Sequence, residues 1–291
     1  MKQGNGKVRQ NQGKQERRFR QSLLASAIAL ALLPGIPPVM AANKTGNDTD
    51  GIVEVNNGET VNSVYGWYYD DATPANGGEV TINGGTITGN VYGGSSNSGD
   101  VTNNTVTVNG GTIGSNVYGG YSWQREATGN TVTVTDGAAI TGDVYGGYSV
   151  DTVAATGNKV TVSGGAIGGT VWGGRAAFSD ATGNTVTVTD GTIDGDVYGG
   201  LAGVDDATGN TVTVDGGTIK NSVIGGDSEY GAVTGNTITI RGGTINGHVA
   251  GGSSQSGVVT NNTIILEGNP DISQASLYGG YTDGQGTIAD N

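Results

Sequence analysis

The sequence predicts an all-β fold, a single-stranded parallel β-helix (β-solenoid) of about nine coils with about 26 residues each. A unit with the sequence GNTVTVTDGTIDGDVYGG, residues 183–200, recurs in close copies from about residue 53 to residue 280. The 57 glycines weaken helices, and no window after residue 42 keeps an apolar stripe at helical spacing. One asparagine of the unit recurs at steps of 26, 28, 26, 26, 26 and 26 residues, as Asn104, Asn130, Asn158, Asn184, Asn210, Asn236 and Asn262.

Each copy of the unit alternates between aliphatic and other residues with the period of a β-strand. In residues 185–198 the aliphatic positions are Val186, Val188, Ile193 and Val197, and Thr, Asp, Gly or Tyr stands between them. Gly-containing turn signals separate the short runs, because glycine takes positive φ without steric cost. We therefore expect about three strands per coil, followed by a longer return loop.

Stacking the coils places equivalent side chains above one another, about 4.8 Å apart. Four aliphatic ladders then fill the core, since one coil alone cannot enclose it. The first two ladders are Val80, Val106, Val132, Val160, Val186, Val212, Ile238 and Ile264, and Ile82, Val108, Val134, Val162, Val188, Val214, Ile240 and Leu266. The other two are Ile87, Ile113, Ile140, Ile167, Ile193, Ile219, Ile245 and Ile272, and Val91, Val117, Val144, Val171, Val197, Val223, Val249 and Leu277.

The recurring asparagines predict a second structural ladder. An asparagine turned inward at a corner can pair its amide with the asparagine of the next coil, which satisfies buried polar atoms. We interpret this column as structural and not as a ligand site.

Residues 1–42 have the pattern of a signal peptide with an extended basic n-region. Seven basic residues precede an apolar run from Leu23 to Leu33, and Ala41 or Ala42 closes a small-residue cleavage site. The run is too short to span a bilayer. We therefore expect an exported chain in which residues 43–51 are a frayed start and residues 52–291 are the β-helix repeats.

The first and last coils depart from the repeat. The first carries Trp67, Tyr68 and Tyr69 in its return segment. Terminal repeats deviate because one of their faces has no neighbour, so these aromatic residues predict an N-terminal cap. After Gly280 no C-terminal cap is recognisable.

Composition restricts the class of partner. Without the leader the chain keeps 6 Lys and Arg against 25 Asp and Glu, because the leader holds seven of the 13 basic residues and one of the 26 acidic ones. Such a surface repels nucleic acid and anionic lipid, so we expect neither nucleic-acid binding nor membrane insertion by this segment. The chain has no cysteine and hence no disulfide scaffold.

Two repeated units, ATGNTVTV at residues 181–188 and GDVYGG at residues 195–200, follow a long basic leader in a chain without cysteine. In these features the chain resembles the passenger regions of bacterial autotransporters (type V secretion) and related β-helical surface adhesins. The resemblance implies a right-handed β-helix, a place on the cell surface (outer membrane) or outside the cell, and a role in adhesion or aggregation. It also implies a C-terminal β-barrel translocator, but the segments after Thr260 lack the amphipathic strands of such a barrel.

The expected function is therefore that of a non-catalytic passenger for adhesion, aggregation or surface-layer structure. Its partners would be glycans or proteins of a host or neighbouring cell, or further copies of itself. A polysaccharide-acting β-helix enzyme is an alternative, but the single histidine, His248, replaces Asp or Asn at an outward position, and basic residues are rare in the coils. We predict no catalytic residue, no cofactor and no metal site, although rows such as Asp143 and Asp196 could gather calcium ligands.

A second alternative function follows from a T-x-T pattern, which resembles the arrays of β-solenoid ice-binding proteins. Threonine is also a common exposed strand residue, and Lys159 interrupts the pattern. The array comprises Thr105 and Thr107, Thr131 and Thr133, Thr185 and Thr187, Thr211 and Thr213, and Thr237 and Thr239.

Aromatic residues form a further column and also occupy the return loops. The column holds Tyr65, Tyr92, Tyr118, Tyr145, Trp172 and Tyr198, and it either stacks internally or forms an outward ridge for sugar rings or a partner. The loops differ from coil to coil, and we expect them all on one side of the rod, where repeat proteins place recognition. The candidate binding surface comprises Tyr118, Trp123, Tyr145, Tyr148, Trp172, Phe178, Tyr198 and Tyr230.

Overall fold

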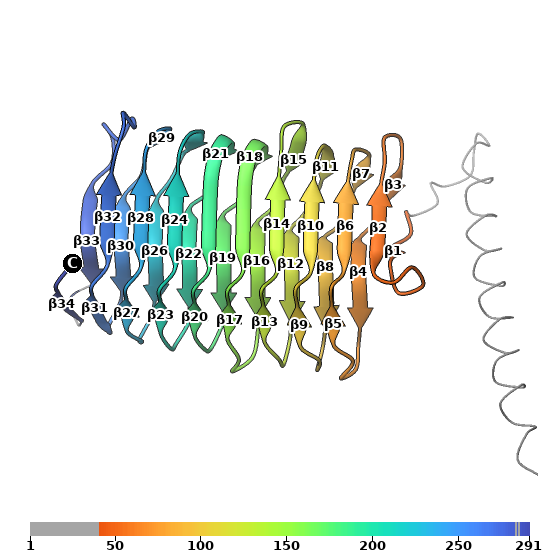
Figure 1. Ribbon diagram of the computed structural model, residues 1–291, viewed down its shortest axis with the longest axis horizontal. Coiled ribbons are helices and arrows are strands. Elements are labelled where there is room, and N and C mark those ends of the chain that lie inside the picture. The colour runs from red at the N-terminus through yellow and green to blue at the C-terminus, as the bar shows by residue number, and fades with distance from the viewer. Residues whose placement is uncertain (1–40, 283, 285) are drawn as a thin grey trace, which may run out of the picture. The chain divides into compact units, whose positions relative to one another are not determined.

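The computed structural model describes residues 41–282, 284 and 286–291, and the chain from Ala42 onward forms one unit. All its regular elements are β-strands, which confirms the predicted all-β solenoid. The strands lie across the long axis of the rod, and equivalent strands of successive coils pair in parallel to form three sheets (Figure 1).

The first sheet contains ten strands, and all of them except β1 are built mainly from the part of the repeat that reads V-Y-G-G or a variant of it. These strands are β1 (Lys44–Thr45), β4 (Val64–Tyr69), β8 (Val91–Ser96), β12 (Val117–Ser122), β16 (Val144–Ser149), β19 (Val171–Ala176), β22 (Val197–Ala202), β26 (Val223–Ser228), β30 (Val249–Ser254) and β33 (Leu277–Thr282).

The second sheet contains 15 strands from the T-V-T-V and T-I parts, which merge into one long strand in two coils. They are β2 (Ile52–Val55), β3 (Thr60–Val61), β6 (Glu79–Ile82), β7 (Thr86–Ile87), β10 (Thr105–Val108), β11 (Gly111–Ile113), β14 (Thr131–Val134), β15 (Ala138–Ile140), β18 (Lys159–Ile167), β21 (Thr185–Ile193), β24 (Thr211–Val214), β25 (Thr218–Ile219), β28 (Thr237–Ile240), β29 (Thr244–Ile245) and β32 (Thr263–Leu266).

The third sheet consists of nine short strands inside the segments that the sequence indicated only as return loops. It adds a strand to each coil beyond those predicted. Its members are β5 (Ala75–Asn76), β9 (Val101–Thr102), β13 (Ala127–Thr128), β17 (Ala155–Thr156), β20 (Ala181–Thr182), β23 (Ala207–Thr208), β27 (Val233–Thr234), β31 (Val258–Thr260) and β34 (Thr287–Ala289).

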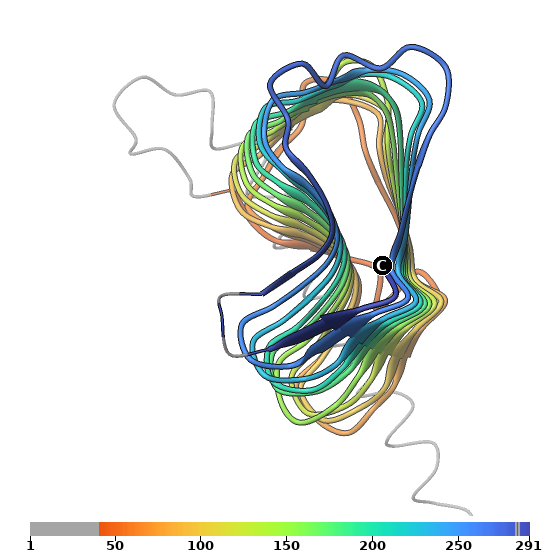
Figure 2. The ribbon, with the colours of Figure 1, turned by 90° about the vertical axis from the view of Figure 1, so that its left-hand side faces the viewer.

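The coils have two lobes joined by a narrow waist (Figure 2). The four predicted aliphatic ladders fill the larger core and are buried in every coil except the last described one, which confirms their assignment in those coils. The smaller core contains a fifth ladder that the sequence analysis missed. Its members are Ala75, Val101, Ala127, Ala155, Ala181, Ala207, Val233 and Val259, each with no exposed surface.

The asparagine ladder runs between the two cores. Asn184 Oδ1 accepts hydrogen bonds from the backbone N–H and the Nδ2 of Asn158, at 2.9 and 3.0 Å. Asn184 Nδ2 donates to Asn210 Oδ1 and to the carbonyl of Ala155. The same pattern joins the buried asparagines from Asn104 onward, so the predicted structural role is confirmed.

Glycine at the waist makes room for these amides. A Cβ on Gly174 would lie 2.4 Å from Asn184 Cγ, and one on Gly200 would lie 2.5 Å from Asn210 Cγ. The second glycine of each Y-G-G unit therefore lets the sheet approach the asparagine ladder closely.

The first coil is capped by its own residues. Trp67 pairs with Gly94 in register, and its ring approaches Gly78, which stands where later coils have asparagine. Trp67 Nε1 donates to the carbonyl of Asn76, so Trp67 confirms the predicted cap. The start predicted to be frayed instead contributes β1, and Lys44 reaches Glu59 at 2.8 Å.

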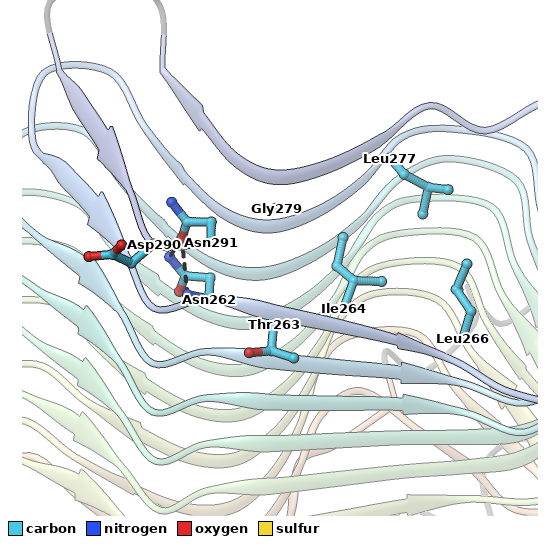
Figure 3. A pocket seen from close by; sticks show the side chains of 8 residues that line it. All are labelled: Asn262, Thr263, Ile264, Leu266, Leu277, Gly279, Asp290 and Asn291. Atoms are coloured by element: carbon cyan, nitrogen blue, oxygen red, sulfur yellow. Dashed lines mark hydrogen bonds between the residues drawn. The ribbon is translucent and has the colours of Figure 1, made fainter.

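The last described coil leaves ladder residues uncovered. Leu266 and Leu277, predicted as core, expose 46% and 44% of their surface because no further described coil packs on them. They line a hollow of about 410 Å³ (Figure 3). Asn291 continues the asparagine ladder here, because its Oδ1 accepts from Asn262 Nδ2 at 2.8 Å.

The leader predicted over residues 1–42 lies almost entirely outside the described residues. Among the residues that are described, no helix has the length and apolarity needed to cross a membrane.

Candidate binding surface

The outward face of the ten-stranded sheet carries a continuous stack of aromatic rings. Tyr65, Tyr92, Tyr118 and Tyr145 stack in turn with centroid distances of 4.8, 4.9 and 4.8 Å and interplanar angles of 6°, 5° and 6°. Trp172 continues the stack at 4.5 Å from Tyr145. The parallel register fixes this spacing, because equivalent residues pair directly across the strands.

The hydroxyl groups of the stacked tyrosines bind side chains two residues earlier in the chain. Asn90 Nδ2 donates to the Tyr92 hydroxyl at 2.8 Å, and the Tyr145 hydroxyl donates to Asp143 at 3.1 Å. Burial raises the pKa of the Tyr145 phenol, and the carboxylate of Asp143 adds to the effect. Burial also raises the pKa of Tyr198. These phenols stay neutral donors and acceptors at neutral pH.

A second row of side chains lies beside the stack, beyond the two glycines of each strand. Tyr121 meets Tyr118 edge-on at 5.4 Å, and Tyr148 lies 5.3 Å from Tyr145. Arg175 follows in the same register, with its guanidinium 5.1 Å from the Tyr148 ring. The second row covers much of the stack from the solvent.

The eight predicted surface residues therefore fall into three groups. Tyr118 and Tyr145 are 7% and 3% exposed, so they serve the stack and have little surface left for a partner. Trp172, Tyr198 and Tyr148 are half-buried in the two rows. The remaining three residues, Trp123, Phe178 and Tyr230, project from return loops and are 49%, 54% and 56% exposed.

These loops share one edge of the rod, which we call the loop edge (residues 97–100, 123–126, 150–154, 177–180, 203–206 and 229–232). In each coil the loop connects a strand of the first sheet to a strand of the third, at the lower edge in Figure 1. The predicted placement of the loops on one side is thus confirmed. Serines at the strand ends hold several loops, as when Ser228 Oγ accepts from the backbone N–H of Gly231.

A groove of about 620 Å³ runs along part of the loop edge. Phe178, Leu201 and Val204 supply its apolar lining. Its charged lining residues are Arg175, Asp227 and Glu229. Trp172 Nε1 and Arg175 Nε are buried and have no hydrogen-bond partner among the described residues. The volume of the groove falls in the range of about 300–1,000 Å³ that is typical of ligand pockets.

A polar ladder at the strand starts escaped the sequence analysis. Each member's side chain accepts the backbone N–H of the next member, as when Asp143 accepts from Thr170 and Asp196 from Ser222, both at 2.8 Å. Asp143 and Asp196 therefore serve as structural hydrogen-bond acceptors at the corner before the strand. The ladder comprises Ser63, Asn90, Asn116, Asp143, Thr170, Asp196, Ser222 and His248.

The charged groups do not gather into a metal-binding cluster within the part of the chain that the structure describes. The T-x-T residues stand opposite their counterparts on neighbouring strands, as Thr105 does with Thr131 and Thr107 with Thr133. Lys159 interrupts one row, as predicted, and Thr239 is buried.

Comparison with protein-family models, with curated proteins and with solved structures finds no match.

Proposed function

We propose that this protein is an exported, non-catalytic β-solenoid that binds glycans or proteins of neighbouring cells, or further copies of itself, through the loop edge. The observation that carries the proposal is the exposure of Trp123, Phe178 and Tyr230 on loops that share one edge. Exposed apolar groups gathered on one face are typical of interaction sites, and aromatic residues supply much of the binding energy in interfaces.

A contrast within the chain supports the same proposal. The ladder positions keep nearly the same residue in every coil, whereas the loops read YSWQREAT, RAAFSDAT, LAGVDDAT and DSEYGAVT. Side chains that hold the rod together are thus separated from side chains that are free to vary. The signal-like leader and the resemblance to autotransporter passengers suggest a place at the cell surface.

The combined change Trp123→Ser, Phe178→Ser and Tyr230→Ser is expected to lower attachment at least tenfold and to leave thermal unfolding nearly unchanged. Exposed side chains contribute little to stability, whereas aromatic anchors contribute about 2 kcal/mol or more each to binding. The measurement is attachment of protein-coated beads to one another and to glycan-coated surfaces.

Ile52→Ser is the matched control, because Ile52 is an exposed apolar residue on β2, away from the loop edge. It should attach like the unmodified protein. Equal attachment by the triple variant would refute the proposal.

Ice binding is a second candidate, favoured by the in-register threonine rows on β10, β14, β21 and β24. If the rows bind ice, Thr213→Lys will reduce the shaping of ice crystals, because a charged side chain disturbs the regular hydroxyl array. Ice crystals that grow unshaped in a solution of the unmodified protein would exclude this function.

A further inference from the structure

The aromatic stack is interrupted near one end of the rod. The positions that follow Tyr198 in register are Ile224 and Ala250, after which Tyr278 restores a ring. Ala250 leaves the space of a ring unfilled, and a hollow of about 260 Å³ opens there. We call this hollow the ladder gap.

The ladder gap has an apolar floor and aromatic walls. Ile224 and Ala250 form the floor, and His248, Tyr278 and Tyr281 also line the hollow. Tyr278 lies 5.7 Å from His248 at 69° and 5.6 Å from Tyr281 at 60°. The rings meet at an angle, so they form a corner and do not close the space by stacking.

Polar groups border the same space. In coils that carry a tyrosine at this position, the residue two positions before it can bind the tyrosine hydroxyl, as Asn90 and Asn116 do. Beside the ladder gap those positions hold Ser222 and His248, which both line it. Ser222 Oγ accepts the backbone N–H of His248 and keeps a hydroxyl proton to donate.

We propose that the ladder gap binds one pyranose ring of a neutral glycan. This proposal goes beyond the proposed function, because the ladder gap lies on the first sheet outside the loop edge; it names a second site and its ligand class. The volume lies below the range of about 300–1,000 Å³ for larger ligands, so it suits a single ring. A pyranose has apolar C–H faces for the tyrosines and hydroxyl groups for Ser222 and His248, and the acidic surface disfavours an anionic ligand.

The test is to fill the gap with tyrosine, the residue that most other coils carry at this position. Ala250→Tyr is expected to weaken binding of methyl glycosides at least tenfold and to keep or raise the melting temperature, because seven of the described coils carry a ring at this position. The measurement is saturation-transfer NMR with a panel of methyl hexosides and methyl N-acetylhexosaminides, titrated to about 50 mM, since one ring is expected to bind with a Kd of about 1–10 mM.

The matched control is Thr112→Tyr, which adds the same ring on β11 of the second sheet, away from the gap. Thr112 is exposed, and tyrosine is a favourable strand residue, so the fold and glycoside binding should be unchanged. A second variant, Tyr278→Ala, removes a wall and should also weaken binding at least tenfold.

Three results would overturn the proposal: no glycoside binding up to the highest concentration, binding that survives Ala250→Tyr, or binding of p-cresol in place of every glycoside. The last result would assign the gap to an aromatic side chain of a protein. Failure of the ladder-gap proposal is distinguishable from failure of the proposed function. If only the ladder-gap proposal fails, beads coated with the unmodified protein still attach through the loop edge, and beads coated with the triple serine variant do not.

Discussion

Replacing Asn184 with alanine is expected to lower the free energy of unfolding by about 3–5 kcal/mol, because the change leaves several buried polar groups without a hydrogen-bond partner. Asn184 Oδ1 accepts two hydrogen bonds from Asn158, and its Nδ2 donates to Ala155 and Asn210. Each buried polar group that loses its partner and cannot reach solvent costs about 1–3 kcal/mol. Chemical denaturation followed by circular dichroism measures the change.

Thr187→Ala is the control, since Thr187 lies three residues away and faces outward. Its expected cost is below about 1 kcal/mol. Asn184→Asp adds a further check, because a carboxylate cannot donate to Asn210 and a buried charge is costly. Equal stability of the Asn184→Ala and Thr187→Ala variants would contradict the structural role of the ladder.

Gly174→Ala is expected to destabilise the protein by about 3 kcal/mol or more, because its methyl group would overlap the asparagine ladder. The added Cβ would lie 2.4 Å from both Cγ and Oδ1 of Asn184. The control is Gly183→Ala: Gly183 has φ +64°, and nothing lies within 4 Å of an added Cβ. It should cost only about 1–2 kcal/mol from the left-handed backbone.

A double-mutant cycle separates the clash from other effects of the methyl group. Asn184→Ala removes the atoms that Gly174→Ala would strike, so the double variant should be less destabilised than the sum of the single variants by about 1 kcal/mol or more. Strict additivity would show that Gly174 does not act through Asn184.

Much of the fold follows from patterns that recur without change. The alternation of Val186 and Val188, the fixed aliphatic positions and the asparagine period define strands, ladders and register, because parallel stacking repeats each contact. Trp67 as a cap also follows from its place in an irregular first coil. In each of these cases one residue type recurs at one position of the repeat, or another residue replaces it in a single coil.

Features whose residue types vary were harder to predict. The polar ladder uses Asn, Asp, Thr, Ser and His for one task, since any side chain that accepts a backbone N–H suffices. The fifth ladder is built largely from alanine, whose burial leaves a weak pattern, and it lies in segments that looked like loops. Asn291 escaped notice because its coil lacks the usual unit around it.

The candidate surface was predictable only in part. Exposure of Trp123, Phe178 and Tyr230 follows from their place in variable loops. Whether Tyr118 and Tyr145 form an outward ridge depends on the second row, because Tyr121 and Tyr148 lie three residues further along the chain and still contact the stack. A period along the chain does not reveal that contact. The ladder gap likewise needs the position of Tyr281 relative to Tyr278.

The central claim is that the rod binds through the loop edge without chemical conversion of its ligand. The most direct measurement applies the protein and its triple serine variant to one printed panel of neutral and acidic glycans and cell-surface proteins, with mass spectrometry of the released material. The account predicts binding to at least one target, a loss of at least tenfold in the triple variant and no cleaved product. Equal binding by both proteins, or release of glycan fragments by the unmodified protein, would contradict it.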